Sequence, residues 1–397
     1  MSAQHSNYDV VIVGGAMYGA SLSWWLSRMP GFDGRILVIE RDPTYEFAAT
    51  SHTNSCIRQQ FSNPVNIAIS RFGAEFVHNF RDFLGGDPDV PDLALHSFGY
   101  LYLADTPEFA ANLQESQKIQ AGLGAATQHL SRAEIAEKWP FYQLDDITAG
   151  NHNAVDEGYF DGGTMFDWFR RMGARNGVEY IHDEVTGVVK NAGRIDSVTL
   201  KSGASIGCGV LVNAAGTRGA QVAALAGLDI PVEPRKRYTY ILEAAEPLDR
   251  DLPLTIDPSG VHFRTDGRYY MLGGHADRDP AVDHDDFIAD HSLWEEKFWP
   301  ILATRVPAFE RVRVINMWIG HYDYNTLDQN AIVGPSPEIG NFMFLNGFSG
   351  HGLQQAPALG RGLAELITDG SYRSIDLSAF GAGRILAGEK FPEKAVI

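Results

Sequence analysis

The chain has 397 residues, 44% of them hydrophobic, which is enough for more than one core and favours two interleaved domains. Its 32 basic and 50 acidic side chains give a net charge of −18, which repels phosphate backbones and anionic membranes, so we expect no nucleic-acid or membrane partner. No segment approaches the roughly 20 apolar residues of a membrane helix, and the first residues lack a secretory signal pattern. The two cysteines, Cys56 and Cys208, permit at most one disulfide, which favours a reducing cytoplasm. They also lack metal-ligand spacing, so we predict no metal site.

The segment from Tyr8 to Glu40 has the pattern of a dinucleotide-binding strand, helix and strand. An apolar strand leads to a tight turn at Gly14, and a helix beginning near Met17 would point its first N–H groups at a pyrophosphate. Gly19 lets that helix pack close to the strand. The pattern predicts binding of FAD or NAD. The alternative, an ordinary glycine-rich turn from strand to helix, stays open.

The residue that ends the second strand indicates which dinucleotide binds. Glu40 places a carboxylate where it accepts hydrogen bonds from ribose hydroxyls and repels a 2′-phosphate, which argues against NADP. Ala16 stands at the second glycine position of the fingerprint, where the backbone comes closest to phosphate. Its methyl group relaxes the motif.

After this motif the chain leaves the first domain and later returns to it. The elements that we predict are, in order, a polar loop over 41–63 that returns to the cofactor, a helix over 65–84, a strand at 100–103, a helix over 107–123, a turn-rich hinge at 156–163, a helix ending near Gly177, a strand and hairpin over 179–200, and a strand over 210–216. The small residues that end the last strand suit contact with a nucleotide.

The remaining sequence predicts an antiparallel sheet followed by a second glycine-rich turn. The elements are strands at 238–242, 260–263, 269–272 and 312–319, a helix over 290–301, a strand that begins at 341, a glycine loop, and a helix over 357–368. This ending repeats the logic of the N-terminal motif. We expect the tail after Phe380 to be bound to the surface or loosely ordered.

Four segments together resemble the family of FAD-dependent amine oxidoreductases that contains glycine oxidase, sarcosine oxidase and D-amino-acid oxidase. They are the fingerprint 14–19 with Glu40, the loop 51–60, the strand 212–216 and the ending 347–357. The residues 57–62 and the ending are most similar to a branch with sarcosine oxidase β-subunit-like proteins and a mitochondrial flavoprotein implicated in respiratory complex I assembly.

The resemblance implies an α/β fold in which a Rossmann-like FAD-binding domain is interleaved with an α+β substrate domain built on an antiparallel sheet. We expect the FAD-binding domain over 1–85, 150–230 and 323–375, the substrate domain over 86–149 and 231–322, and a C-terminal tail over 376–397.

The resemblance also implies FAD in an extended form, with its ring at the domain interface against the loops 51–58 and 350–354. N–H groups of the second loop would stabilise negative charge on the reduced ring. The cofactor-binding residues that it implies are Gly14, Ala16, Met17, Gly19, Glu40, Arg41, Ser51, His52, Thr53, Val185, Ala215, Gly216, Gly320, Gly350, His351, Gly352, Leu353 and Gln354.

Members of this family move a hydride equivalent from the α-carbon of an amine to flavin N5, and water hydrolyses the resulting imine to a carbonyl compound and an amine. The residues that we expect to act on the substrate are Arg58, His262, His275, Tyr322 and Gln354. Arg58 is the first candidate for a carboxylate clamp, because a guanidinium binds a carboxylate through two hydrogen bonds. A role in binding phosphate or in a structural salt bridge is the alternative.

The sequence departs from monomeric sarcosine oxidase at several positions. Gln354 stands where the resemblance predicts a substrate-binding lysine, and Met271 falls near the lysine associated with oxygen activation. No cysteine follows Cys208, so the C-terminal thioether to the flavin is absent and we expect noncovalent FAD. His52 lies in the loop that carries a flavin-linked histidine in dimethylglycine dehydrogenases, but Thr53 aligns better with that position.

Histidines and cations near the implied pocket are further candidates. His262 and His275 fall on strands that face the substrate in glycine oxidase, and a neutral imidazole there could accept the amine proton. The alternative for each is a structural role, which is the more common one for a lone histidine. Tyr322 replaces the carboxylate-binding arginine of glycine oxidase, which argues against glycine as substrate. Arg264 and the cluster 235–238 add cations, although such runs are commonly solvated faces.

We expect a substrate with a carboxylated secondary amine, from sarcosine to iminodiacetate, and O2 as electron acceptor with release of H2O2. The alternatives are a dehydrogenase that passes electrons to a quinone or a carrier protein, a flavin-containing assembly or interaction protein, and an NAD-dependent dehydrogenase. The last leaves the ending 347–357 unexplained. An oligomer is possible.

Overall fold

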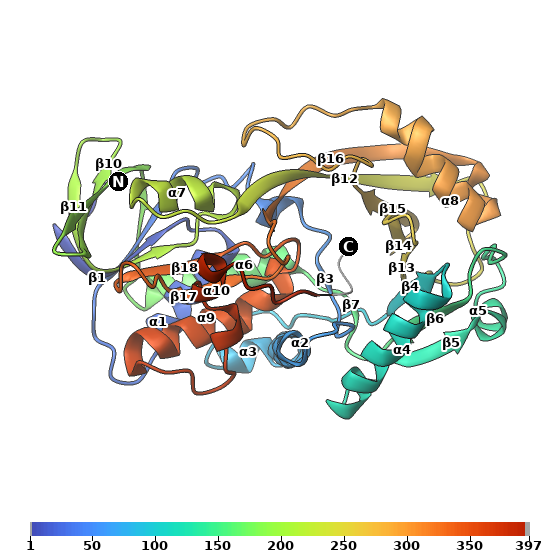
Figure 1. Ribbon diagram of the computed structural model, residues 1–397, viewed down its shortest axis with the longest axis horizontal. Helices are drawn as coiled ribbons and strands as arrows, with labels where there is room; N and C mark the ends of the chain where they lie inside the picture. Colours follow the sequence, from blue (N-terminus) through green and yellow to red (C-terminus); the bar gives the residue numbers. More distant parts are fainter. Residues whose placement is uncertain (1, 394–397) are drawn as a thin grey trace.

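The computed structural model describes residues 2–393 and contains two large β-sheets, which lie side by side in Figure 1. The strands of the first sheet are β1 (Asn7–Val13), β2 (Ile36–Glu40), β8 (Glu179–His182), β9 (Val185–Asn191), β10 (Arg194–Leu200), β11 (Ser205–Asn213), β17 (Ile332–Pro335) and β18 (Phe342–Asn346). Its central order is β17-β18-β11-β1-β2-β8, with β10 and β9 added beside β11.

The first sheet is parallel at its centre and is covered on both faces. In β1, Val10 and Ile12 pack against one set of helices, whereas Val11 and Val13 belong to a separate core on the other face. This alternation explains why the strand is apolar at every position from Val10 to Val13. The helices of the first face are α1 (Met17–Leu26), α2 (Pro64–His78), α3 (Phe80–Phe83), α6 (Gly162–Arg175) and α9 (Gly352–Asp369), and α7 (Gly219–Leu225) covers the second.

The second sheet has the order β16-β12-β15-β14-β13-β4-β6-β5, and its pairs are antiparallel except for β13 with β4. Its strands are β4 (Tyr100–Ala104), β5 (Gln128–Ser131), β6 (Ala149–Asn153), β12 (Val232–Ala244), β13 (Leu254–Ile256), β14 (His262–Asp266), β15 (Tyr269–Gly274) and β16 (Val312–Asn325). The long pair of β12 and β16 reaches toward the first sheet (Figure 1). The α/β fold with two sheets is therefore confirmed, while the proposed domain boundaries stay a prediction.

The remaining elements connect or flank the two sheets. They are η1 (Ala49–His52), β3 (Cys56–Ile57), α4 (Pro107–Gly122), α5 (Arg132–Lys138), β7 (Gly158–Tyr159), η2 (Gly216–Arg218), η3 (Trp294–Phe298), α8 (Trp299–Arg305), η4 (Pro307–Glu310), η5 (Ser378–Phe380) and α10 (Gly383–Ala387). Within residues 2–393, we find no helix with the length and apolar character that a membrane span requires.

Three helices differ from the prediction. The helix expected over 65–84 is divided at Asn79 into α2 and α3, because the backbone there leaves helical geometry (φ −110°, ψ 29°). The helix expected over 290–301 becomes a π-helical turn, η3, followed by α8, which has Pro300 in its first turn, where proline is favoured. The last long helix begins at Gly352 and contains Pro357 rather than beginning there.

The C-terminal tail is docked on the protein. Leu377 and Phe380 are fully buried, and Arg384 and Glu393 are also buried. Of the two expectations for the tail, surface-bound or loosely ordered, the structure supports the bound form up to residue 393.

Candidate active site

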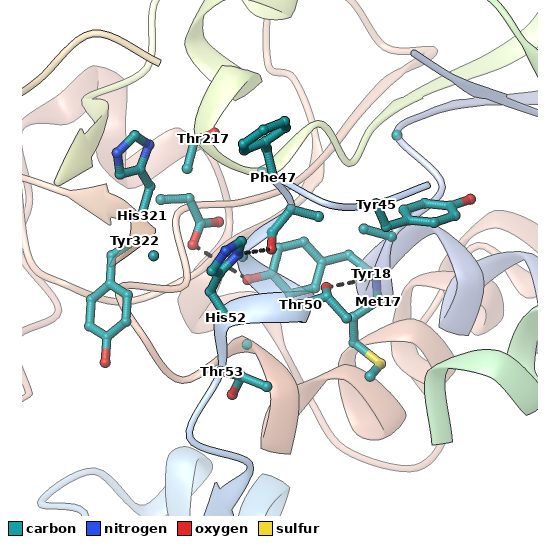
Figure 2. A pocket seen from close by; sticks show the side chains of 18 of the residues that line it. Met17, Tyr18, Tyr45, Phe47, Thr50, His52, Thr53, Thr217, His321 and Tyr322 are labelled. Atoms are coloured by element: carbon teal, nitrogen blue, oxygen red, sulfur yellow. Dashed lines mark hydrogen bonds between the residues drawn. The ribbon is translucent and has the colours of Figure 1, made fainter. Parts of the chain in front are cut away.

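A cavity of about 990 Å³ lies between the two sheets. Its wall combines the β1–α1 turn, the segment around η1, strands β12, β14 and β16, and the loop before α9. Figure 2 shows Tyr18, His52, Thr53 and Tyr322 around this space, although they come from three distant parts of the chain.

The turn after β1 depends on glycine. Gly14 has a φ of +98°, and a Cβ there would lie 2.5 Å from the carbonyl oxygen of Ala214. A Cβ at Gly19 would lie 1.9 Å from the carbonyl oxygen of Gly14, so α1 can pack this closely on the turn only with glycine. Ala16 is the N-cap of α1 and supplies no capping side chain, and the first turn of α1 contains no acidic residue. The positive end of the helix therefore faces the cavity without a carboxylate on its own first turn.

Glu40 lies in the wall at the end of β2. Its carboxylate accepts hydrogen bonds from the N–H groups of Gly15 and Asp42, each at 2.8 Å. Burial raises the pKa of Glu40, and the two N–H groups partly oppose this effect. The neighbouring Arg41 has a half-exposed side chain, 4.0 Å from Asp285. Glu40 thus joins the strand to the glycine turn and presents a carboxylate to the cavity.

The segment around η1 lies against β16. A Cβ at Gly320 would lie 2.8 Å from Cβ of His52, and Nε1 of Trp318 donates to the His52 carbonyl oxygen at 3.3 Å. Nδ1 of His52 lies 3.2 Å from the carbonyl oxygen of Ala48 (Figure 2). The close approach fixes Thr53, the next residue, in the cavity wall.

Arg58 is buried, with 1% of its surface exposed, yet it reaches the cavity wall. Its Nη2 lies 3.0 Å from Nε2 of His351, and the guanidinium stacks 4.2 Å from the ring centre of Phe61. A guanidinium only donates, so Nε2 of His351 must accept and Nδ1 carries the proton. Burial and the charge of Arg58 hold the pKa of His351 well below its usual value, which keeps this imidazole neutral.

Gln354 holds the backbone of Arg58. Its Oε1 accepts a hydrogen bond from the Arg58 N–H at 2.9 Å. Gln354, which stands where the resemblance predicts a lysine, therefore supports the arginine. The carboxylate of Glu157 holds the next two residues: it accepts from the N–H of Gln59 at 2.7 Å and from the side chain of Gln60 at 2.8 Å. Burial raises the pKa of Glu157 to about 7.

The loop before α9 also requires glycine. Gly350 has a φ of +92°, and a Cβ there would lie 2.3 Å from the ring of Tyr322. A Cβ at Gly352 would lie 2.0 Å from the hydroxyl of Tyr18. His351 is the N-cap of α9, whose first turn contains no acidic residue. This helix thus directs a second positive terminus toward the same cavity.

Asp323 organises that loop from the opposite side. Its Oδ2 accepts from the N–H groups of Gly347 and Phe348, at 3.1 and 3.2 Å, and Oδ1 lies 3.4 Å from the Tyr18 hydroxyl. Burial raises the pKa of Asp323 to about 7, against the opposing effect of these donors. Sequence reasoning missed both Asp323 and Tyr18. Tyr18 lies inside the fingerprint, and Asp323 follows Tyr322 directly.

The candidate histidines differ in position. His262 lies in the wall with Nε2 3.2 Å from the amide nitrogen of Asn54, and burial lowers its pKa to about 4. It is therefore neutral near pH 7. His275 instead places Nδ1 2.7 Å from the carbonyl oxygen of Ala276, outside the cavity wall.

Two of the predicted cationic residues, Arg237 and Arg264, also differ in whether they line the cavity. Arg237, from the cluster 235–238, lies in the wall and binds Asp279 through two hydrogen bonds of 2.8 and 3.0 Å. Arg264 is absent from the residues that line the cavity, and its Nη1 binds Asp266 at 2.7 Å. Sequence reasoning gave Arg237 no separate role, because a run of cations resembles a solvated face.

Most of the predicted site residues meet at this cavity. Those in its wall are Gly14, Ala16, Met17, Glu40, Arg41, His52, Thr53, Arg58, Val185, Ala215, Gly216, His262, Gly320, Tyr322, Gly350, His351, Gly352, Leu353 and Gln354. Gly19, Ser51 and His275 are absent from the described residues that line the cavity, and their roles as site residues stay predictions. Gly19 packs behind the Gly14 turn, and the Ser51 hydroxyl donates to the Tyr45 carbonyl oxygen at 2.7 Å.

The wall fits an extended dinucleotide. Glu40 suits a ribose at one end, and the Gly14 turn and the start of α1 suit a pyrophosphate. At the other end, the glycine loop and the start of α9 suit the edge of a flavin ring that becomes negative on reduction. Within residues 2–393, no cluster of three or more His, Cys, Asp or Glu side chains could hold a metal ion.

Comparisons with known proteins agree with this geometry. The chain is 38% identical to the FAD-dependent oxidoreductase domain-containing protein 1 of Xenopus laevis, over 98% of this chain and 85% of the relative. It is 25% identical to the sarcosine oxidase subunit beta of Rhizobium meliloti, over 98% and 91% of the two chains. The solved structure of L-proline dehydrogenase from P. horikoshii has the same fold, with a TM-score of 0.84, 23% identity, and coverage of 97% and 99%.

The family described as FAD dependent oxidoreductase (DAO) matches residues 9–366, which include both glycine turns and the Arg58 segment. The FAD dependence of this family agrees with a cavity wall that fits an extended dinucleotide. Related proteins act on the CH–NH groups of amines. The chain therefore belongs to the DAO family of FAD-dependent oxidoreductases.

Proposed function

We propose that this protein oxidises the C–N bond of a secondary amino acid, such as the N-substituted glycines sarcosine and iminodiacetate. The observation that carries this proposal is the buried guanidinium of Arg58 in the cavity wall, supported by a neutral imidazole. A desolvated guanidinium binds a carboxylate strongly and fixes its orientation. The names of relatives that act on sarcosine and L-proline, both secondary amines, support the same substrate class.

The chemistry that FAD would supply is that of an acceptor for a hydride from the α-carbon, and water would hydrolyse the resulting imine to glyoxylate or another aldehyde and an amine. Arg58 would hold the substrate carboxylate, and Tyr322, packed on the Gly350 loop, would limit the position of the carbon skeleton. His262 is neutral and its Nε2 faces the amide of Asn54, so it would accept the amine proton only after this contact opens.

We propose that the flavin is bound noncovalently. The imidazole of His52, the one candidate for a link that the sequence offered, is turned to the carbonyl oxygen of Ala48. Cys208 is absent from the residues that line the cavity, and burial raises the pKa of the Cys56 thiol, which disfavours its nucleophilic thiolate.

The electron acceptor is proposed to be O2, with release of H2O2. A dehydrogenase of similar substrates is the second candidate, because Met271 falls near the position of the lysine associated with oxygen activation, and none of the described residues that line the cavity is a lysine. The name of the L-proline dehydrogenase relative favours the same alternative. Counting H2O2 released for each substrate oxidised under air separates them: one peroxide per turnover supports an oxidase, and none supports a dehydrogenase.

The test of the substrate class is anaerobic titration of the purified yellow protein with sarcosine, iminodiacetate and L-proline. Bleaching of the flavin absorption by any of these supports the proposal. Bleaching by primary amino acids alone would replace it with another substrate class. A flavin that no amine reduces would instead favour an assembly or interaction protein. A cytoplasmic location stays a proposal that rests on the cysteine content of the sequence.

A further inference from the structure

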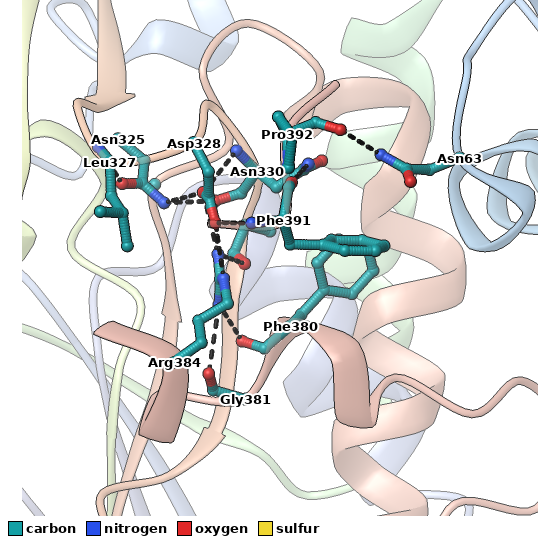
Figure 3. A network of polar contacts seen from close by, with 12 residues as sticks. Asn63, Asn325, Leu327, Asp328, Asn330, Phe380, Gly381, Arg384, Phe391 and Pro392 are labelled. Atoms are coloured by element: carbon teal, nitrogen blue, oxygen red, sulfur yellow. Dashed lines mark hydrogen bonds and ion pairs between the residues drawn. The ribbon is translucent and has the colours of Figure 1, made fainter. Parts of the chain in front are cut away.

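The C-terminal segment 378–393, named here the C-terminal strap, is anchored to the turn that follows β16 (Figure 3). Arg384 places Nε 2.7 Å and Nη2 3.2 Å from the two carboxylate oxygens of Asp328, and both side chains are buried. The same carboxylate accepts from the N–H of Phe391 at 3.0 Å. The side-chain amide of Asn330 donates to the Phe391 carbonyl oxygen. These contacts hold the strap at two of its residues, Arg384 and Phe391, against the turn after β16.

The strap ends on the first turn of α2. The carboxylate of Glu393 is buried and accepts from the N–H groups of Ser62 and Asn63, at 2.6 and 3.3 Å. It also accepts from the side chain of Asn66 at 3.1 Å. Asn63 is the N-cap of α2 but makes no side-chain cap bond, and its amide donates to the Pro392 carbonyl oxygen at 2.7 Å instead. Glu393 therefore holds the backbone of the two residues that precede α2 and the side chain of Asn66 in its first turn.

The backbone that Glu393 holds at Ser62 is the end of the segment 58–62, which begins with Arg58. At its start, the N–H of Arg58 is held by Gln354, and the N–H of Gln59 is held by Glu157. At its end, the N–H of Ser62 is held by Glu393. The ring of Phe61, which directly precedes Ser62, packs against the Arg58 guanidinium and lies edge-on to His351 at 5.2 Å. A shift at Ser62 would therefore move the ring that supports the guanidinium.

A second connection runs through α9. Oδ1 of Asn66 accepts from the side chain of Gln355 at 3.2 Å, and Gln355 follows the residue that holds Arg58. The amide of Asn66 donates both to Glu393 and to Asn330. The strap, the first turn of α2 and the first turn of α9 thus share one buried network beneath the cavity.

We propose that the C-terminal strap positions the substrate site, with Glu393 as a positioning residue that sets the guanidinium of Arg58 for a carboxylate. The inference rests on the proposed function of Arg58. It assigns to residues 378–393 an effect on substrate binding that passes through Arg58, because no residue of the strap lines the cavity among those that the structure describes.

The test compares Glu393→Ala with the wild-type holoprotein. The dissociation constant of (methylthio)acetate, a carboxylate without an oxidisable C–N bond, is measured from the change in flavin absorption. We expect it to rise about tenfold, a smaller effect than the roughly hundredfold cost that a 1 Å misplacement can have. The FAD content should stay unchanged. Glu393→Gln, which keeps one of the two acceptor oxygens, should restore part of the affinity. Glu389→Gln, on the exposed part of the same strap, is the matched control.

The outcomes separate the strap from the clamp. Unchanged affinity in Glu393→Ala, together with lost affinity in Arg58→Ala, overturns the strap and keeps the clamp. Unchanged affinity in both variants overturns both. A lower melting temperature without a change in affinity shows a purely structural role and also overturns the inference. If Glu393→Ala does not fold, Asn63→Ala, which removes the amide that binds Pro392 and Glu393, replaces it with the same criteria.

Discussion

Arg58 is buried and contacts the imidazole of His351, which stays neutral. Its replacement gives the first prediction. Arg58→Ala should raise KM for a carboxylated secondary amine by the equivalent of about 2–5 kcal/mol, because a buried partner of the carboxylate is lost. Arg58→Lys should recover only part, since an ammonium lacks the planar pair of donors. Stopped-flow reduction of the flavin measures both effects.

The control for Arg58 is Arg268→Ala, which removes an exposed arginine that is absent from the residues that line the cavity. It should leave substrate reduction unaltered. Equal reduction rates in wild type and Arg58→Ala, with FAD fully bound, would assign Arg58 to the cofactor or to structure. The clamp would then have to be sought at Arg237, Tyr322 or His262, which also line the cavity.

Glu40 gives the second prediction. Glu40→Ala should weaken FAD binding by about 1.5–3 kcal/mol, because it removes a charged acceptor from ribose hydroxyls. Since Glu40 also holds the N–H of Gly15, Glu40→Gln serves as the control that keeps an acceptor oxygen while losing the charge. Fluorescence titration of the apoprotein with FAD measures the change. An unaltered dissociation constant in Glu40→Ala would mean that the fingerprint does not bind the ribose.

Asp323 gives a prediction about pH. Burial raises its pKa from 3.8 in the unfolded chain to about 7, so between these values the folded protein binds more protons than the unfolded one. Stability relative to Asp323→Asn, which does not titrate, should therefore be greatest below about pH 4 and fall as pH rises toward about 7. Denaturant unfolding of the two proteins at pH 5 and pH 8 measures the difference. A difference that is equal at the two pH values would contradict the prediction.

At the scale of elements, sequence patterns predicted the structure well where local rules act alone. The strand, turn and helix from Asn7 to Leu26 follow from an apolar run, Gly14 and Gly19. Helix ends were less predictable where distant contacts determine them. The backbone that leads into α2 is held by Glu393, and nothing near Asn63 in the sequence indicates this contact. Likewise, α9 contains Pro357, a residue that local rules place at the start of a helix.

The same distinction applies to the candidate site. The glycine turns and Glu40 were predictable because a cofactor places known demands on them. The support for Arg58 was not, because His351, Phe61 and Gln354 meet it only through packing of the loop before α9 on the Arg58 segment. Asp323 was missed because a carboxylate that binds backbone N–H groups leaves no pattern in the sequence.

The loop before α9 gives a prediction with a matched control. Gly350 and Gly177 have φ values of +92° and +93°, but a Cβ at Gly350 would meet Tyr322 at 2.3 Å, whereas one at Gly177 would meet nothing within 4 Å. Both substitutions to alanine should cost roughly 1–2 kcal/mol of stability from backbone strain. Only Gly350→Ala should also perturb the flavin absorption spectrum and weaken FAD retention. Equal effects of the two variants on the flavin would show that the loop does not contact the ring.

At the scale of the whole molecule, the cavity is built from parts that are far apart in the chain. Its wall contains residues from Val13 to Gln354, including β1 of the first sheet and β12, β14 and β16 of the second. A ligand that fills this cavity contacts both sheets at once, and the unfolded chain has no such binding surface. FAD binding and folding of the molecule should therefore be coupled.

This coupling gives the last prediction. If FAD is bound noncovalently, its removal should lower the melting temperature, and FAD at 100 times its dissociation constant should add about 2.7 kcal/mol to the stability of the apoprotein. The melting temperature should rise with the logarithm of FAD concentration, and Glu40→Ala should need more FAD for the same rise. Calorimetry of the apoprotein measures this, with NADP as the control that Glu40 should reject. Acid precipitation supplies an independent check, because yellow colour retained in the pellet would show a covalent flavin and direct attention to His52.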